Sequence, residues 1–344
     1  MTVALIAVQL EIPMAVLDGG DRLRAHVEAA GAAAGDAARG AADRLRVFPA
    51  ATGHMVPLAL GPAAARRART LGDAMAQIAL RRPWSVARGL LDARSPRADH
   101  AVILAFAADV DRWMRATFAA IARRHRATVV AGSYLRVRAD GGVANSSLTF
   151  GPDGRLVATT DKVNLVPFLE DRRAGGLALS RGAAEAVPVI DCGWGRLATL
   201  ICYDAFREPH TASERFVPVA ARVDAAGADV IANPAANPWP WQLGWIHADP
   251  GEHVTRAEQW RNEGLPATLA GLHHARWGVT AHLVARLLDL RFEGASEILR
   301  RDGDRVTQVA RAADHRHAGH VAVVAELGAP SYTSPRQPSP EPSP

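Results

Sequence analysis

The chain has 344 residues, of which 49% are hydrophobic, and a formal net charge of +5. This length and composition indicate a globular protein with a large buried core, built as one large α/β domain or as two ordinary ones. The arginines are spread among 35 acidic residues and form no basic block interleaved with aromatic residues. Nucleic-acid binding is therefore not expected. Membrane insertion is not expected either, because no apolar stretch approaches the ~20 residues that a membrane span requires.

The first residues, MTVALIAVQLEIP, hold a short apolar run with no basic residue before it and no small-residue cleavage site after it. This pattern is typical of a first strand rather than of a signal peptide, and we expect a cytoplasmic protein. The two cysteines, Cys192 and Cys202, are too few for a disulfide framework. In a reducing compartment both are expected to be free thiols.

The first half of the chain alternates strands with helices. The expected elements are a strand over 3–10, an Ala-rich helix over 21–42, a strand over 44–49, a helix over 109–127 and the strand TVVAGS directly after it. Residues 143–162 predict a hairpin around a Gly-Pro-Asp-Gly turn, and Lys162 stands where its second strand ends. The segment from 66 to 100 is long for a connection and is a candidate lid.

The second half repeats this order. The expected elements are the strands AVPVID and RLATLICY joined by the turn CGWG, a helix over 211–226, the strand DVIANP, a helix over 257–270, and the strand-like runs RFEGASEIL, DRVTQVA and HVAVVAEL. Two β-α-β blocks with hairpins predict two sheets packed between helical layers, a four-layer αββα sandwich. We expect one domain over 1–328 and a disordered Pro/Ser-rich tail over 329–344.

Cys202 ends an apolar strand, just before a polar turn that leads into a helix. A thiol in this position, with open backbone N–H groups nearby, is well placed as a nucleophile. Free cysteine is also among the residue types most often buried in a core, so this feature alone does not establish a reactive thiol. Cys192, in a turn with Gly193 and Gly195, has no such signals and is expected to be structural.

Lys162 is the only lysine among the 40 lysines and arginines of the chain. An isolated lysine is usually a solvated surface charge, but a chain that uses arginine at every other basic position favours a special role here. A compact ammonium can direct one strong donor at a developing oxyanion and can adjust its pKa beside a thiolate. A guanidinium is broad, permanently charged and shaped for bidentate partners.

Five stretches, in order, carry a family resemblance: NSSLTFGPDGRLV, DKVNLVPFLE, GRLATLICYD, GADVIANP and FEGASEILRRDGDRV. Together they resemble the nitrilase superfamily of carbon–nitrogen hydrolases, and the match runs from residue 3 to about 325. The resemblance implies an αββα sandwich, usually dimerised, and a Glu-Lys-Cys triad that uses no metal and no organic cofactor. It assigns the lysine to Lys162, the nucleophile to Cys202 and a second, positioning glutamate to Glu170.

One member of the implied triad is missing. The general-base glutamate of the family follows the second strand in an FPE pattern, whereas this chain reads VFPAATGH, with Ala50 at that position. Glu11 and Glu252 lack positional support as substitutes, and Glu170 has support only for its own role. The chain is therefore expected to be an impaired or inactive enzyme, either by design or as a natural homologue that lost hydrolysis.

The expected activity is hydrolysis of a small amide or ureido compound, or less readily a nitrile, through a thioester on Cys202. The resemblance implies that Lys162 and the backbone N–H of Tyr203 would hold the oxyanion. The turn CYD is similar to the amidase and carbamoylase branches, whereas true nitrilases typically carry a tryptophan and a glutamate there. Two alternatives are an N-acyltransferase that uses the same thioester, and a catalytically silent binding protein, which Ala50 favours.

The pocket walls are expected to come from the loops that follow strands, at 51–57, 134–141, 168–176 and 233–245. Phe168 and Asn233 are candidate substrate-binding residues in these loops, together with Tyr203. The aromatic run NPAANPWPWQLGW would form a rigid wall, a dimer contact or simple packing. The expected partners are a small-molecule substrate and further copies of the chain.

Overall fold

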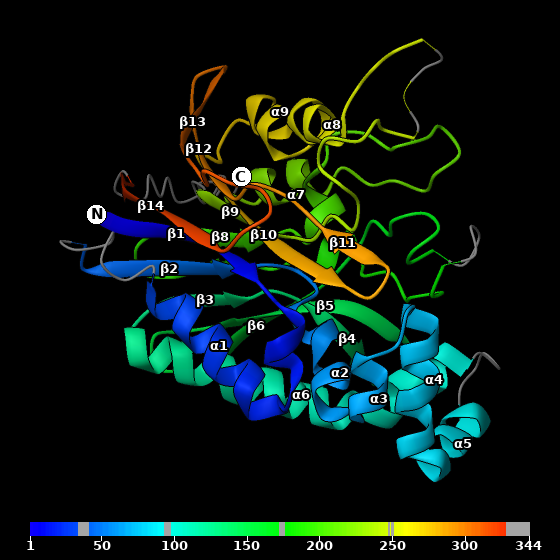
Figure 1. Ribbon diagram of the computed structural model, residues 1–344. Coiled ribbons are helices and arrows are strands. Elements are labelled where there is room, and N and C mark those ends of the chain that lie inside the picture. The colour runs from blue at the N-terminus through cyan, green and yellow to red at the C-terminus, as the bar shows by residue number, and fades with distance from the viewer. Residues whose placement is uncertain (34–40, 93–97, 172–175, 247, 249–250, 328–344) are drawn as a thin grey trace, which may run out of the picture.

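The computed structural model describes residues 1–33, 41–92, 98–171, 176–246, 248 and 251–327. Its strands lie in two facing layers, with helices on both outer sides (Figure 1). The four-layer αββα sandwich predicted from the sequence is confirmed. The tail over 329–344 lies outside the described residues.

The first sheet is built around β1 (Thr2–Glu11), which pairs in parallel with β2 (Asp43–Phe48) and antiparallel with β14 (Gly319–Glu326). The sheet continues through β3 (Thr128–Ala131) to β5 (Val143–Phe150), which also pairs with β4 (Tyr134–Val137) and β6 (Leu156–Asp161). Both faces of β1 are covered: Val3 and Leu5 belong to the core between the sheets, while Ala4 and Ile6 belong to the core under the helices. This explains why β1 reads as a continuous apolar run.

The second sheet is built around β10 (Trp277–Leu287). This strand pairs in parallel with β9 (Val230–Ala235) and antiparallel with β11 (Leu290–Phe292) and β12 (Glu297–Asp302). The sheet is completed by β8 (Arg196–Thr199) and β7 (Val189–Asp191) beyond β9 and by β13 (Arg305–Arg311) beyond β12. β1 and β10 pair through Leu10 and Leu283, which joins the two sheets at this point.

The helices cover the outer faces of the two sheets. On the first sheet lie α1 (Gly20–Ala33) and α6 (Ala98–His125), and on the second lie α7 (Val219–Ala225), α8 (Arg256–Glu263) and α9 (Leu265–Ala270) (Figure 1). The segment after β2 holds the short helices η3 (Thr52–Met55), α2 (Val56–Leu60), α3 (Ala63–Arg66), α4 (Leu71–Arg81) and α5 (Pro83–Asp92). Further 3-10 helices in the described part of the chain are η1 (Met14–Leu17), η5 (Ala184–Ala186) and η6 (Cys202–Ala205).

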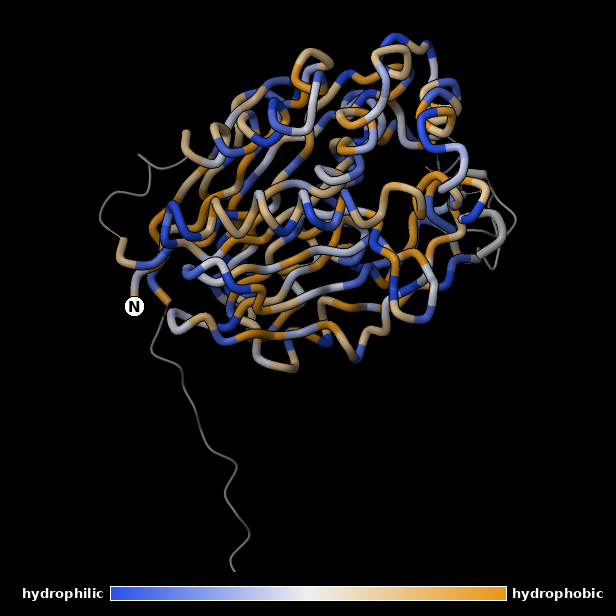
Figure 2. Tube along the Cα trace, turned by 90° about the horizontal axis from the view of Figure 1, so that it is seen from below, coloured by the Kyte–Doolittle hydropathy of each residue, from blue (hydrophilic) through white to orange (hydrophobic). Residues whose placement is uncertain are grey.

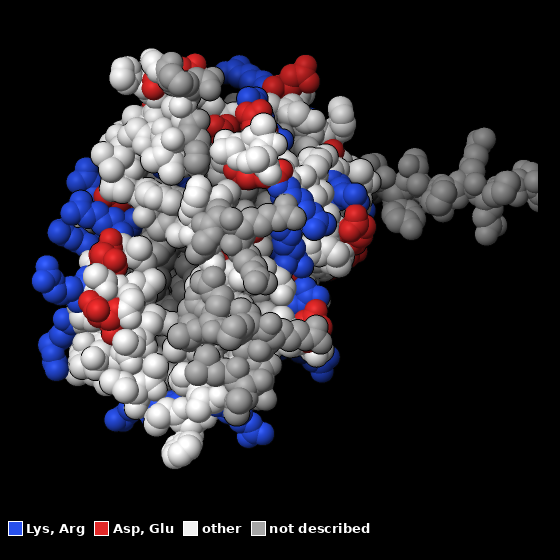
Figure 3. Space-filling view, turned by 90° about the vertical axis from the view of Figure 1, so that its right-hand side faces the viewer, with Lys and Arg blue, Asp and Glu red and all other residues white. Residues whose placement is uncertain are grey.

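Hydrophobic residues concentrate on the strands and on the inner faces of the helices, as Figure 2 shows. Figure 3 views the side of the molecule with α4 and α5, where basic side chains gather along one edge. Among the described helices none has the length and apolar character needed to cross a membrane.

Several predicted elements differ from the structure. The helix predicted over 211–226 is only Val219–Ala225, and the helix predicted over 257–270 is two helices separated by Gly264, whose backbone is extended. The helix predicted over 109–127 begins earlier, at Ala98. β10 was not predicted, because Thr280 and His282 interrupt its apolar pattern although both are buried.

Candidate active site

Cys202 lies on a sharp turn after β8, at the first residue of η6, and only 8% of it is exposed. Its φ angle is 52°, in the left-handed region that non-glycine residues rarely adopt. The Asn233 side-chain amide donates to the carbonyl oxygens of Leu200 at 2.7 Å and Cys202 at 3.1 Å. A strained residue held in this way by its surroundings is typical of a functional site.

Lys162 directly follows β6 and is 2% exposed. Its Nζ atom donates to Oε2 of Glu170 at 2.5 Å. Burial opposes the charged ammonium, but the negative charge of Glu170, supported by Cys202 and Asp204, outweighs it and raises the pKa of Lys162. The single lysine of the chain is therefore a buried, charged group beside the candidate nucleophile.

Glu170 uses both carboxylate oxygens in hydrogen bonds. Oε1 accepts from Nδ2 of Asn145 at 2.9 Å, and Oε2 accepts from the Val166 backbone N–H at 2.9 Å as well as from Lys162. Burial favours the neutral acid, but the charge of Lys162 and these hydrogen bonds lower the pKa of Glu170. A carboxylate held in this way is a poor proton acceptor, so its geometry suits a positioning role.

Asp204 connects the turn of the nucleophile to the turn of the lysine. Its carboxylate accepts from the backbone N–H of Val163 at 3.1 Å and of Asn164 at 2.6 Å. Burial raises the pKa of Asp204 to about 7, against the lowering effects of Lys162 and of these two N–H donors. No sequence signal pointed to Asp204 itself, although it belongs to the turn CYD.

Ala50 is buried in a compact apolar cluster with Cys202, Tyr203, Trp241 and other residues. The next residue, Ala51, has a φ angle of 60°, and its N–H donates to Oγ of Ser133 at 3.0 Å. The loop after β2 therefore brings the methyl group of Ala50 into the same cluster as the candidate nucleophile. A methyl group cannot accept a proton.

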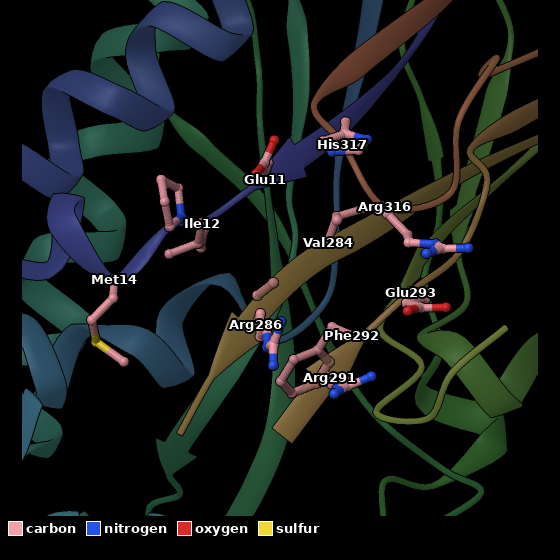
Figure 4. A pocket seen from close by; sticks show the side chains of 12 residues that line it. Glu11, Ile12, Met14, Val284, Arg286, Arg291, Phe292, Glu293, Arg316 and His317 are labelled. Carbon is pink, nitrogen blue, oxygen red and sulfur yellow. The ribbon is translucent and has the colours of Figure 1, made fainter. Parts of the chain in front are cut away.

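The other two glutamates considered as substitutes for the missing base lie elsewhere. Oε2 of Glu11 accepts from the Ala318 backbone N–H at 2.9 Å, and Glu11 lines a separate, charged pocket (Figure 4). Glu252 is exposed on a surface loop. The structure therefore places neither carboxylate at Cys202.

The candidate substrate-binding residues differ in their surroundings. The Tyr203 side chain is buried, and its hydroxyl donates to Oε2 of Glu214 at 2.6 Å, so only its backbone N–H remains a candidate oxyanion donor. Asn233 is fully buried, and its amide holds the nucleophile turn. Phe168 is 60% exposed and has a φ angle of 63°.

His54, in η3, is a further residue of the candidate site that was not predicted from the sequence. Its Nε2 is buried and has no hydrogen-bond partner among the described residues. Burial lowers the pKa of His54 to about 4, with Glu170 raising it and Lys162 lowering it, so the ring is neutral near pH 7 and lies within electrostatic reach of the ion pair. Its position four residues after Ala50, in a loop predicted to wall the pocket, was the available signal.

Cys192 has different surroundings from Cys202. It packs against the core between the sheets, and burial raises its pKa to about 12. The described residues contain no group of three or more His, Cys, Asp or Glu side chains that could hold a metal ion.

The geometry describes a buried Lys–Glu ion pair beside a thiol on a strained turn, which is a candidate centre for nucleophilic catalysis. The carbon–nitrogen hydrolase family model matches residues 84–251, which include Lys162, Glu170 and Cys202. This matched segment covers just under half of the chain, and it is similar to carbon–nitrogen hydrolases, the class that the sequence motifs resemble.

Solved structures with the same fold include a mutant amidase from Nesterenkonia sp. AN1, described as showing the result of Michael addition of acrylamide at its active-site cysteine. It is 18% identical, with a TM-score of 0.53, over 95% of this chain and 93% of that one. A carbon–nitrogen hydrolase from Helicobacter pylori G27 is 16% identical, with a TM-score of 0.58, over 94% of this chain and 89% of that one. No curated protein matches the chain.

Proposed function

We propose that this chain acts on small amides through a covalent thioester at Cys202, and that its turnover is slow because Ala50 replaces the general base. The observation that carries this proposal is the buried Lys162–Glu170 ion pair, whose lysine interacts electrostatically with Cys202. The roles of the individual residues are part of the proposal.

The reaction begins when the Cys202 thiol loses its proton and the thiolate attacks the carbonyl carbon of the amide. Lys162 Nζ and the Tyr203 backbone N–H stabilise the negative charge on the carbonyl oxygen. The carbon–nitrogen bond then breaks, and the nitrogen takes up a proton and leaves as ammonia. Water attacks the thioester, which releases the carboxylic acid and regenerates the thiol.

The weak step is the first proton transfer. The Cys202 Sγ contacts the carbonyl oxygen of Ala236 at 3.7 Å, and a carbonyl cannot serve as a useful base. Glu170 is occupied by three donors and its pKa is lowered. Two candidate acceptors for slow turnover remain near the ion pair: the neutral Nε2 of His54, which has no hydrogen-bond partner among the described residues, and the Asp204 carboxylate, whose pKa burial raises to about 7.

An amide or ureido compound is favoured over a nitrile because Tyr203 and Asp204 follow the nucleophile, as in the amidase and carbamoylase branches. The amidase from Nesterenkonia sp. AN1, whose active-site cysteine forms an adduct with acrylamide, supports the same choice. Dimerisation, which the family resemblance implies, stays a prediction that sedimentation velocity tests.

Intact-mass measurement after incubation with a panel of small amides, ureido compounds and nitriles tests the proposal. We expect an acyl adduct on Cys202 that decays to free acid. The Cys202→Ala chain is the matched control and should form no adduct, while His54→Gln should slow adduct formation if His54 accepts the proton. Acylated amine instead of free acid would identify an acyltransferase.

A second candidate function is binding without catalysis, which the replacement of the base by Ala50 specifically favours. In that case the chain binds an amide, but neither adduct nor acid forms on any timescale of the assay. The same mass measurement, combined with calorimetric binding, separates this candidate from slow hydrolysis.

A further inference from the structure

An apolar cavity of about 540 Å³ lies between the helices after β2, the helix α6 and the β10–β11 hairpin. Its walls include Met75, Ile78, Val102, Leu135, Leu177 and Phe292. The volume is within the range of sites that hold small organic ligands. His54 is the only residue with a polar side chain among those that line the cavity.

Two residues of the cavity wall neighbour residues that hold or precede Glu170 of the candidate active site. Leu135 of β4 pairs directly with Asn145 of β5, whose side chain holds Glu170. Residues directly opposite in an antiparallel pair project to the same face, so the Leu135 and Asn145 side chains are neighbours. Leu177, a second residue of the cavity wall, donates its backbone N–H to the carbonyl oxygen of Leu169 at 2.9 Å. Leu169 is the residue before Glu170.

Helix α4 supplies a wall of the cavity. Leu71, Met75, Ile78 and Ala79 recur with helical spacing, so they form one apolar face, and all four line the cavity. The helix precedes residue 84, where the match to the carbon–nitrogen hydrolase family begins. This wall is therefore a feature of the present chain outside the matched segment.

We infer that this cavity binds a hydrocarbon chain of the substrate, so that aliphatic amides with several methylenes are preferred over short or charged ones. The inference rests on the proposed function, because the reacting amide must lie at Cys202 and Lys162. The lining offers no charged partner for a polar substituent, and a buried polar group without a partner is unfavourable. Hydrocarbon needs no such partner.

The lining of the neighbouring pocket in Figure 4 differs from that of the apolar cavity and would suit a different kind of ligand. This pocket shares Phe292 with the apolar cavity but is lined by Glu11, Arg286, Glu293, Arg316 and other polar residues. A charged or strongly polar group has better partners there, whereas an alkyl chain loses water most completely in the apolar cavity.

Calorimetric binding of linear primary amides from acetamide to octanamide to the full chain tests this inference. Each methylene that enters the cavity should tighten binding by up to about fourfold until the cavity is full. N-alkyl acetamides of the same lengths show whether the chain lies on the acyl or the nitrogen side of the bond. Length-dependent tightening in either series supports the inference, and equal affinity across both series overturns it.

Two variants of α4 provide a matched pair. Ala76 is exposed and lines the cavity at its mouth, and Gln77 is its exposed neighbour outside the lining. Ala76→Trp should end the length dependence at a shorter chain, while Gln77→Trp should leave it unchanged. An identical length dependence in both variants contradicts the assignment of the cavity.

The proposed hydrolysis and the proposed hydrocarbon site can be refuted independently of each other. Acid release from acetamide without any effect of chain length would leave the proposed hydrolysis intact and refute the hydrocarbon site. Length-dependent binding without adduct or acid would support the hydrocarbon site and refute the hydrolysis.

Discussion

Replacing Ala50 by glutamate restores the proton acceptor that the nitrilase-superfamily pattern places after the second strand. The position is well fixed, because the Thr52 hydroxyl donates to the Pro49 carbonyl at 2.7 Å and the Ala51 N–H donates to Ser133. General bases typically contribute about 10²–10⁴ in rate, and we expect an increase of this size in amide hydrolysis.

The substitution also has a cost in stability. Ala50 is 3% exposed and its cluster contains Ile201, Trp241 and Trp260, so a carboxyl group there is largely desolvated. We expect the free energy of unfolding to fall by about 1–3 kcal/mol, the usual cost of burying a polar group with incomplete hydrogen bonding. Burial should also raise the pKa of the new carboxyl, which brings it closer to the value that suits a base near neutral pH.

The assay is release of free acid from an amide that binds, measured across a pH range, with thermal unfolding measured in parallel. Ala50→Gln is the matched control, because it adds nearly the same volume without a basic group. We expect acceleration with Glu and none with Gln. A folded Ala50→Glu chain that binds amides, ureido compounds or nitriles but hydrolyses none of them would refute the missing-base account.

Three further predictions follow from the surroundings of single residues. Cys202 should react with iodoacetamide faster than Cys192, because burial raises the pKa of Cys192 to about 12. Peptide mapping that finds Cys192 labelled first would contradict the assignment of Cys202 as the nucleophile. Lys162→Arg in the Ala50→Glu background should lower the rate of amide hydrolysis by about 10²–10³, because a broad guanidinium does not fit the 2.5 Å contact with Glu170. Near-normal turnover by this variant would show that Lys162 is dispensable. Burial, together with the charges of Arg311 and Arg256, lowers the pKa of His282 to about 3. Because the ring can take up a proton only in the unfolded chain, the free energy of unfolding should decrease as the pH falls from about 6.5 towards 3. Denaturant titrations at several pH values should show a smaller loss of stability for His282→Gln, and an unchanged loss would exclude His282 as a source.

Local sequence signals predicted much of the fold and the central part of the candidate site. The apolar run of β1, the Gly-Pro-Asp-Gly hairpin and Pro49 at the end of β2 each act over a few residues, so they are visible without a structure. Lys162 stands out as the only lysine of the chain, and Cys202 as a thiol at the end of an apolar strand.

The missed features depend on contacts between distant segments. Asp204 binds the backbone N–H of Val163, 41 residues away in sequence, and no local pattern reveals that link. β10 is covered on both faces, and such a strand is usually recognised by a continuous apolar run. Thr280 and His282 interrupt that run although both are buried. The role of His54 depends on which charges surround it after folding.

The buried ion pair also bears on whether the site is still used. Removing Lys162 and Glu170 from water is costly, and replacing such a pair by well-packed apolar residues is often neutral or stabilising. The pair is thus poorly explained by stability alone, whereas an ammonium beside a thiol is directly useful to an acyl-transfer reaction. Ala50 and the cavity wall of α4 precede residue 84, while Lys162, Glu170 and Cys202 lie in the segment that matches the carbon–nitrogen hydrolase family. Under the proposed function, a site that holds the ion pair and the thiol but has Ala50 at the position of the base is expected to turn over slowly rather than to be inert.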